Sequence, residues 1–229
     1  MEQVFVSWSG GKDSCLAAYL ATKAGLEVRY LANTVSEDGQ LSRSHGLSAE
    51  VLKLQAQAIG IPLIQQKTGK NSYEADFKTL LRNLKQEGIT GGVFGDIDFN
   101  AHREWLDRVC GDVGITPHFP LWLQNQDKIM RDFISLGFET VVVATKADLL
   151  GEEWLGRKVD LAFIKDLAGL DKKITPCGEA GEYHTLVIDG PLFQQRLEIL
   201  EANKVSRDGH WFLEIKKSKL KAKQLSKKG

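Results

Sequence analysis

Apolar runs and helical periodicities alternate along the first half of the chain. Short apolar runs predict four strands, at residues 4–8, 28–34, 62–64 and 92–95. Apolar residues at spacings of three and four predict helices after residue 14 and over residues 47–58, 73–84 and 106–113. Two glycines, Gly60 and Gly88, predict the ends of the second and third helices. Strands that alternate with helices through short links are typical of a parallel sheet with helices on both faces.

The second half continues this pattern and then loosens. It predicts a strand at residues 118–122, a helix at 127–136 and a β-branched strand at 141–143. Beyond residue 146 it predicts a strand at residues 183–188 and a terminal hairpin at residues 205–215, split by Asp208 and Gly209. We therefore divide the chain into an α/β domain at residues 1–122 and a smaller C-terminal α/β domain at residues 123–215.

Composition indicates an ordinary globular protein and excludes several classes. The chain has 229 residues, of which 42% are hydrophobic and 26% are charged. No apolar run approaches the roughly 20 residues that span a bilayer, and residues 1–3 lack the features of a signal peptide. Three widely spaced cysteines favour a reducing compartment over a disulfide framework. We expect a cytoplasmic protein with no membrane partner.

Lysines gather at the C-terminal end. Residues 216–229 hold seven of the 30 basic residues and no acid, which leaves 23 basic and 30 acidic residues in residues 1–215. A nucleic-acid-binding protein usually carries a basic face on its folded part, so the composition argues against nucleic acid as a partner. We expect residues 216–229 to form a basic, disordered tail, although such a tail could contact RNA or an acidic partner.

A glycine-rich segment separates the first strand from the first helix and consists of Ser9, Gly10, Gly11, Lys12, Asp13 and Ser14. Consecutive glycines let the backbone approach a ligand closely, and the N-terminus of the following helix favours an anion. The serines add hydroxyl donors and Lys12 adds a positive charge. Asp13 would repel a bare phosphate, but it fits a site in which it binds a Mg²⁺ ion that bridges phosphates. The alternative interpretation is a structural turn capped by a serine.

The segment SGGKDS differs from the two commonest nucleotide-binding loops, because the chain has no G-x-x-x-x-G-K-[ST] and the segment is not G-x-G-x-x-G. It resembles the pyrophosphate loop (PP-loop) of the N-type ATP pyrophosphatases. That resemblance implies a Rossmann-like sheet of the HUP type, with residues 1–122 as the ATP-binding domain and with ATP and Mg²⁺ as cofactors. It also implies cleavage of ATP between its α- and β-phosphates, with Lys12 and Asp13 as catalytic residues.

Four further segments narrow the resemblance: residues 95–97 (GDI), 120–122 (PLW), 154–157 (WLGR) and 178–185 (GEAGEYHT). In this order, and together with SGGKDS, they resemble the diphthine–ammonia ligase family over residues 4–195. The resemblance implies an ATP-dependent, AMP-forming ligase that makes an amide from ammonia and a carboxylate. The implied acceptor is the diphthine of an elongation factor, with residues 123–215 as the substrate domain.

These segments also depart from the pattern of the members that amidate diphthine. Those members typically carry E-G-G-E-[FY]-E-T, so His184 stands where they have an acid. Residues 98–103 and 43–46 also differ from their usual aromatic-Gln-Arg and Met-aromatic-His-Thr stretches. In these respects the chain resembles a bacterial branch of the family linked to cobalamin salvage. That branch implies the same chemistry on a different carboxylate, such as a small molecule.

The last motif supplies the candidate residues for the acceptor half of the reaction. Glu179 and Glu182, three positions apart, could converge on a cation or a protonated amine, which suits an enzyme that binds ammonium and removes a proton from it. We expect His184 to tune the choice of acceptor, and Tyr183 and Thr185 to contact the substrate. The alternative is that the two glutamates are ordinary turn residues and that His184 is a packed histidine.

Other candidates carry weaker signals. Asp96 and Arg103 follow the fourth strand at its carboxyl end, where open α/β sheets bind ligands, so we expect Asp96 at the nucleotide and Arg103 at the substrate. Arg157 could bind the substrate or form a surface ion pair. The spacing of the histidines and cysteines does not favour a zinc site. Cys15 fits a small buried position, and Cys177 lacks an evident base nearby.

Two other functions remain possible from the sequence. Related PP-loop proteins transfer sulfur to tRNA, but they usually need a cysteine pair or an added RNA-binding domain. A nucleotide-binding protein without catalysis would leave Asp13 and the glutamates of the last motif without a role. For the ligase, we expect free ammonia as the nitrogen donor, because a glutaminase module needs a fold of its own of roughly domain size.

Overall fold

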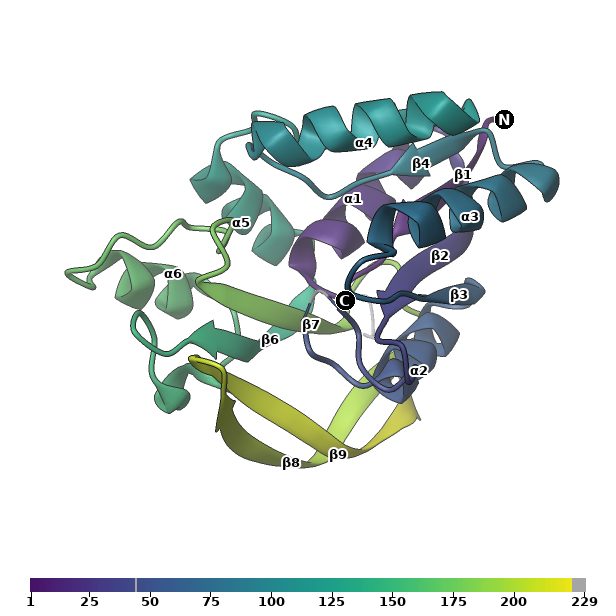
Figure 1. Cartoon of the computed structure of the whole chain (residues 1–229). Helices are drawn as coiled ribbons and strands as arrows, with labels where there is room; N and C mark the ends of the chain where they lie inside the picture. Colours follow the sequence, from purple (N-terminus) through teal and green to yellow (C-terminus); the bar gives the residue numbers. More distant parts are fainter. Residues whose placement is uncertain (44, 224–229) are drawn as a thin grey trace.

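A parallel sheet of five strands forms the first half of the molecule (Figure 1). The structure is a computed structural model and describes residues 1–43 and 45–223. The strands are β1 (Gln3–Ser7), β2 (Glu27–Val35), β3 (Leu63–Lys67), β4 (Gly91–Val93) and β5 (Thr116–His118). They lie in the order β3-β2-β1-β4-β5, and every neighbouring pair is parallel. The predicted parallel sheet is confirmed, with β1 at its centre.

Four helices cover the two faces of this sheet: α1 (Lys12–Lys23), α2 (Ala49–Ile59), α3 (Tyr73–Gln86) and α4 (Asn100–Val113). The apolar residues of α3 and α4 pack with Phe5 and Phe94 on one face, while those of α1 and α2 pack with Val4 and Val6 on the other. The sequence places the ends of α2 well. The Ser48 hydroxyl accepts a hydrogen bond from the backbone N–H of Val51, and Gly60 adopts a φ of 83° at the C-terminus.

A second, antiparallel sheet forms most of the C-terminal half. Its strands are β6 (Glu139–Lys146), β7 (Tyr183–Asp189), β8 (Gln195–Arg207) and β9 (His210–Ala222), in the order β7-β6-β9-β8. Two helices, α5 (Gln126–Ser135) and α6 (Leu161–Ala168), and the short 3₁₀ turn η1 (Glu152–Trp154) accompany it. The predicted hairpin is present and longer than expected, and its turn has positive φ at Asp208 (49°) and Gly209 (73°).

The prediction of a disordered tail from residue 216 is wrong for the part that β9 includes. This strand continues to Ala222 because its apolar residues are paired and its charges are matched. Leu220 lies opposite Leu197 in the hairpin, and the amines of Lys219 and Lys221 lie 3.2 and 3.6 Å from the carboxylate of Glu198. Residues 224–229 of the predicted tail lie outside the described residues.

The prediction of a strand at residues 118–122 is also wrong for residues 119–122. The strand β5 ends at His118, and residues 119–122 form a turn in which the N–H of Trp122 donates to the carbonyl of Phe119 (3.2 Å). The strand does not continue because the backbone turns at residues 120–123, where Leu123 adopts a positive φ of 55°.

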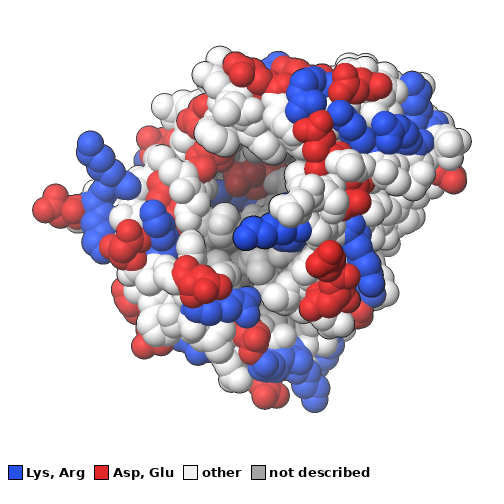
Figure 2. Space-filling model, viewed as in Figure 1, with Lys and Arg blue, Asp and Glu red and all other residues white. Residues whose placement is uncertain are grey.

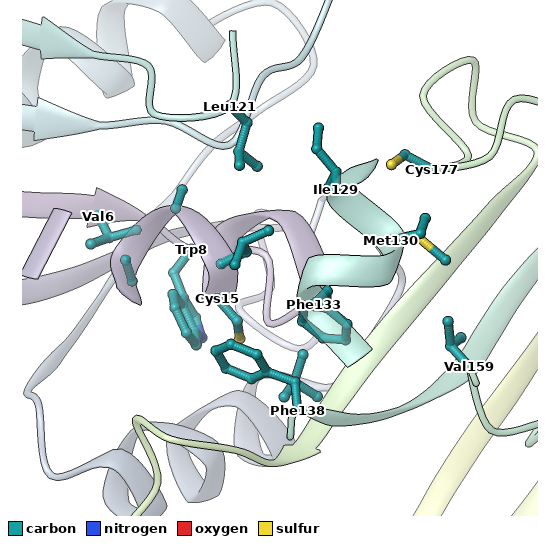
Figure 3. Close-up of a cluster of buried hydrophobic side chains, with 14 of the residues drawn as sticks. Val6, Trp8, Cys15, Leu121, Ile129, Met130, Phe133, Phe138, Val159 and Cys177 are labelled. Atoms are coloured by element: carbon teal, nitrogen blue, oxygen red, sulfur yellow. The ribbon is translucent and has the colours of Figure 1, made fainter. Parts of the chain in front are cut away.

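The two halves share one hydrophobic core (Figure 3). Val6, Trp8 and Cys15 from the first half pack in the same cluster as Phe133 and Phe138 from the second. Cys15 is buried, as predicted. The helix α2 also joins the halves, because its residues Val51 and Leu52 pack in another hydrophobic cluster with side chains of β6 and β7. Among residues 1–43 and 45–223, no helix has the length and apolar character to cross a membrane.

Candidate active site

The glycine-rich loop lies between the end of β1 and the first turn of α1. Gly10 adopts a φ of +79°, and a Cβ at this position would lie 2.5 Å from a side-chain carbon of Leu52, so the site requires glycine. The N-cap of α1 is Gly11, which offers no side-chain cap to the first N–H groups of the helix. The loop therefore presents backbone donors and the positive end of a helix dipole, as an anion site requires.

A buried glutamine that the sequence analysis missed holds this loop against the second sheet. Gln55 donates to the carbonyls of Gly10 (2.9 Å) and Val187 (2.7 Å), and it accepts from the indole of Trp8 (2.9 Å). The N–H of Lys12 also donates to the hydroxyl of Thr185 (3.0 Å). The loop is thus fixed from both halves of the molecule. Gly10 and Gly11 shape the loop but do not line the cavity described next.

The loop forms one wall of a cavity of about 340 Å³. Figure 2 shows a hollow near the centre of the view, with atoms of acidic residues on its floor. Of the residues predicted from the sequence, the loop contributes Ser9, Lys12, Asp13 and Ser14. The last motif contributes Glu179, Tyr183, His184 and Thr185, and the loop after β4 contributes Asp96. In the sheet, β1 lies beside β4, and the strand that follows β1 lies on one side of this pair while the strand that follows β4 lies on the other. The cavity lies at the ends of these two strands, which is where open α/β sheets bind ligands.

Lys12 is buried and fully engaged by neighbours. Its amine donates to the carboxylate of Asp13 (2.8 Å) and to the backbone carbonyl of Cys177, and it lies 5.3 Å from the centre of the Tyr183 ring. Burial opposes the charged amine, but the adjacent Asp13 outweighs it and the pKa of Lys12 rises above its usual value. Lys12 therefore ties the phosphate loop to the last motif as a permanent cation.

Asp13 has one carboxylate oxygen that fits a metal ligand. While one oxygen accepts from Lys12, Oδ1 is buried and has no hydrogen-bond partner among the described residues. Burial raises the pKa of Asp13 although Lys12 lowers it. Carboxylate and hydroxyl oxygens suit Mg²⁺. Within the described residues, no group of three or more His, Cys, Asp and Glu could hold a metal unaided, so a Mg²⁺ ion here would share its ligands with phosphates.

Glu179 lines the cavity and has a carboxyl group that can exchange a proton near neutral pH. Its Oε1 accepts from the N–H of Ile97 (3.1 Å), which fixes the side chain beside the loop after β4. Burial raises the pKa of Glu179 to about 7, and the charges of Asp13 and Asp96 contribute to the rise. Such a group suits general acid–base chemistry.

Glu182 does not converge with Glu179, contrary to the sequence-based prediction. It is only 2% exposed, its Oε1 accepts from the N–H of Thr175 (2.6 Å), and it lies outside the cavity. The backbone turns at Gly181 (φ 81°), between the two glutamates, and their carboxylates bond to different segments, at Ile97 and at Thr175. Glu182 therefore supports the loop that carries Glu179.

The two predicted arginines also lie outside the cavity. The guanidinium of Arg103 stacks on Phe119 and Trp122, at 4.3 and 4.6 Å from their ring centres. Arg157 stacks on Trp154 at 4.6 Å and pairs with Asp166. Planar guanidinium groups favour aromatic faces, which explains why both side chains turn away from the cavity.

The cavity contains residues that the sequence analysis did not select. The ring of His45 stacks on that of His184 with centres 4.5 Å apart, and the ring of His102 pairs with Asp96. Asn33 is buried, and its Oδ1 has no hydrogen-bond partner among the described residues. The sequence signal for His45 was its place in residues 43–46, which correspond to a family motif that contains histidine.

Cys177 is buried beside these groups. Burial raises the pKa of its thiol to about 12. The thiol donates to the carbonyl of Gln126 (3.5 Å), and the Gln126 side chain accepts from the N–H of Cys177 (3.0 Å). The residue therefore holds the last motif in place and stays protonated.

Comparison with known proteins shows the family of the chain. Residues 2–117 match the family model of the diphthamide synthase N-terminal domain, and residues 125–221 match that of the diphthamide synthase C-terminal domain. The chain belongs to the diphthamide synthase family. The resemblance inferred from the five sequence segments is therefore confirmed.

Relatives of this diphthamide synthase family member are named diphthine–ammonia ligases. That of Schizosaccharomyces pombe is 30% identical over 84% of this chain, which spans 35% of the relative. That of Rattus norvegicus is 26% identical over 96% of this chain and 91% of the relative. That of Homo sapiens is 27% identical over 86% of this chain and 82% of the relative. A crystal structure of a predicted subunit of tRNA methyltransferase from Methanocaldococcus jannaschii DSM aligns with a TM-score of 0.46 and 16% identity, over 83% of this chain and 98% of that one.

Proposed function

We propose that this protein is an ATP-dependent ligase that joins ammonia to a carboxylate and forms AMP. The carboxylate oxygen attacks the α-phosphorus of ATP and pyrophosphate leaves, which gives an acyl adenylate. Ammonia then attacks the acyl carbon, AMP leaves, and the nitrogen loses a proton. The observation that carries the proposal is that one cavity holds both the phosphate loop, with Asp13 at its helix end, and Glu179, with a pKa of about 7. The names of the relatives support the same reaction.

In the first half of the reaction, the loop residues bind and orient the nucleotide. The backbone N–H groups of Asp13 and Ser14 and the hydroxyl of Ser9 would donate to phosphate oxygens, because the N–H of Lys12 is bonded to Thr185 and the hydroxyl of Ser14 to the carbonyl of Gly11. Asp13, with Asp96 nearby, would hold Mg²⁺, which supplies positive charge to the phosphates. Lys12 keeps Asp13 and the loop that carries Glu179 at a fixed separation, because its amine contacts both segments.

In the second half, Glu179 takes the proton of the attacking nitrogen. Its carboxylate lies in the cavity and is held at Oε1 by the N–H of Ile97, which leaves Oε2 for the substrate. General bases of this kind work best when their pKa lies near the working pH. Tyr183 and Thr185 would contact the acceptor, because they line the same cavity.

We propose diphthine on an elongation factor as the acceptor, following the names of the relatives, and the cytoplasm as the compartment. The second candidate is a small-molecule carboxylate. It is favoured by His184, which lines the cavity where the diphthine-specific pattern has an acid. Both acceptors use the same residues for the nucleotide and for ammonia.

The proposal is tested with purified protein, MgATP, ammonium and a diphthine-bearing elongation factor. We expect AMP, pyrophosphate and amide in equal amounts, measured by chromatography and mass spectrometry, and no AMP without an acceptor. Asp13→Asn should lower the rate by roughly 100-fold or more, as loss of an electrostatic contact to the reacting group does. Asp148→Asn is the matched control, because its exposed carboxylate pairs with Lys146 at 3.9 Å and lies outside the cavity. Hydrolysis of ATP to ADP, or full activity of Asp13→Asn, would refute the proposal.

A further inference from the structure

Two stacked histidine rings lie against the phosphate loop. His45 precedes α2 and His184 lies on β7, and their ring planes are 24° apart. Nδ1 of His45 lies 3.1 Å from the carbonyl oxygen of Thr185, so this nitrogen carries the proton and donates it. A Cβ at Gly11 would lie 2.5 Å from Cε1 of His45. The His45 ring therefore packs directly on the residue that caps α1.

The cavity offers few other cations to a polyphosphate. Among the described residues that line it, Lys12 is the only lysine or arginine, and its amine is already bonded to Asp13 and to the carbonyl of Cys177. His102 is paired with Asp96. Beyond the Mg²⁺ proposed at Asp13, a ligand with several negative charges at the loop would gain from further positive charge. Of the histidines that line the cavity, His45 and His184 form the pair that packs against the loop.

The surroundings of the pair keep it neutral until an anion approaches. Burial lowers the pKa of His184 to about 4 and that of His45 well below its usual value, and the charge of Lys12 adds to both effects. Other charged or titratable groups near the two rings are Glu182 and His210, Arg207 beside Gly46, and the cavity acids Asp13, Asp96 and Glu179. The same cavity is also lined by His102, Cys177, Tyr73 and Tyr183. A triphosphate at the loop would bring new negative charge close to the rings and favour their protonation.

We propose that the His45–His184 pair binds the β- and γ-phosphates of ATP and takes up a proton as the nucleotide binds. This inference rests on the proposed function, since it requires ATP at the loop. Nδ1–H of His45 already serves Thr185, so the proton is added at Nε2, which then donates to a phosphate oxygen. When the bond between the α- and β-phosphates breaks, the imidazolium stabilises the departing pyrophosphate, and its proton returns to pyrophosphate or water as this product leaves.

The test is titration calorimetry of MgATP, magnesium pyrophosphate and AMP at pH 7.5, in two buffers that differ in ionisation enthalpy. The buffer dependence gives the number of protons taken up. His45→Asn retains a donor near the position of Nδ1 but cannot titrate, and His184→Gln is the second variant. His118→Asn is the control, because His118 lies outside the cavity and bonds to Glu2 at 3.0 Å. Circular dichroism and thermal melting verify that each variant is folded.

We expect MgATP and pyrophosphate to bind the wild-type protein and His118→Asn with uptake of a fraction of a proton, and AMP to bind without it. His45→Asn should lose most of that uptake, His184→Gln should reduce it, and His45→Asn should bind MgATP about tenfold more weakly, a difference that fades toward higher pH. The subtraction between variants removes any proton taken up by Glu179. Equal uptake by the wild type and both folded variants overturns this inference alone, as does the same histidine-dependent uptake with AMP. Absence of ATP binding to the wild type overturns it together with the proposed function.

Discussion

Gly95 provides a sharp test of how the end of β4 positions the phosphate loop. A Cβ added there would lie 2.9 Å from the carbonyl carbon of Asp13, 3.0 Å from the nitrogen of Ser14 and 3.1 Å from the carbonyl oxygen of Asp13. All three are backbone atoms, so no change of side-chain rotamer can relieve the contact. Gly95→Ala must therefore displace either the first turn of α1 or the segment after β4.

The expected cost follows from this geometry. Overpacking by one methyl group in a closely packed region costs about 1–3 kcal/mol. Replacing glycine with alanine also restricts the unfolded chain, which returns about 0.4–1 kcal/mol. We expect a net loss of about 1–2 kcal/mol in the free energy of unfolding. Because the displaced atoms are those that bind phosphate, ATP affinity should fall on the order of tenfold, which corresponds to about 1.4 kcal/mol.

A matched glycine in α4 serves as the control. A Cβ at Gly111 would meet nothing within 4 Å, so Gly111→Ala should stabilise the protein by about 0.5–1 kcal/mol through helix propensity and leave ATP binding unchanged. Urea denaturation followed by tryptophan fluorescence gives the stabilities, and calorimetry gives the ATP affinities. The reasoning is refuted if Gly95→Ala matches the wild type in both stability and ATP affinity.

Three further predictions concern Glu179 and the neighbouring Cys177. Glu179→Gln should slow amide formation by roughly 10²–10⁴-fold while acceptor-dependent exchange of pyrophosphate into ATP persists; loss of both would assign Glu179 to the nucleotide. The base form of Glu179 accumulates as pH rises through about 7, so amide formation at saturating ammonium should rise through that pH in the wild type, and Glu179→Gln should lack this step in a pH–rate profile. Cys177→Ser should retain activity. Iodoacetamide should label Cys177 slowly in the native protein, because burial raises the pKa of its thiol to about 12. Rapid labelling of Cys177, detected by peptide mass spectrometry, together with a parallel loss of activity would contradict this prediction.

Local features of the chain were predictable because the residues that form them are neighbours in the sequence. The phosphate loop is one example, since residues 9–14 carry both the turn and the chemistry. The end of α2 is another, because the left-handed glycine at Gly60 acts within one helical turn. The hairpin turn at Asp208 and Gly209 belongs to the same class. The strand–helix alternation gave the parallel sheet for the same reason.

Features that depend on partners far along the chain were not predictable. The lysine-rich end was expected to be disordered, yet residues 216–222 form a strand because β8 supplies Leu197 and Glu198 opposite them. Glu179 and Glu182 were expected to act together, yet their carboxylates bond to two different segments, at Ile97 and at Thr175.

The membership of the cavity divides in the same way. The sequence by itself determined the phosphate loop and the last motif, because each is a contiguous run whose residue types suit its chemistry. Only the tertiary structure joined them. His45 lies against Thr185, 140 positions away, because α2 and β7 pack in one cluster. Arg103 lies outside the cavity, because its guanidinium packs on the aromatic rings of Phe119 and Trp122. Such pairings are decided by packing between distant segments, and no local pattern encodes that packing.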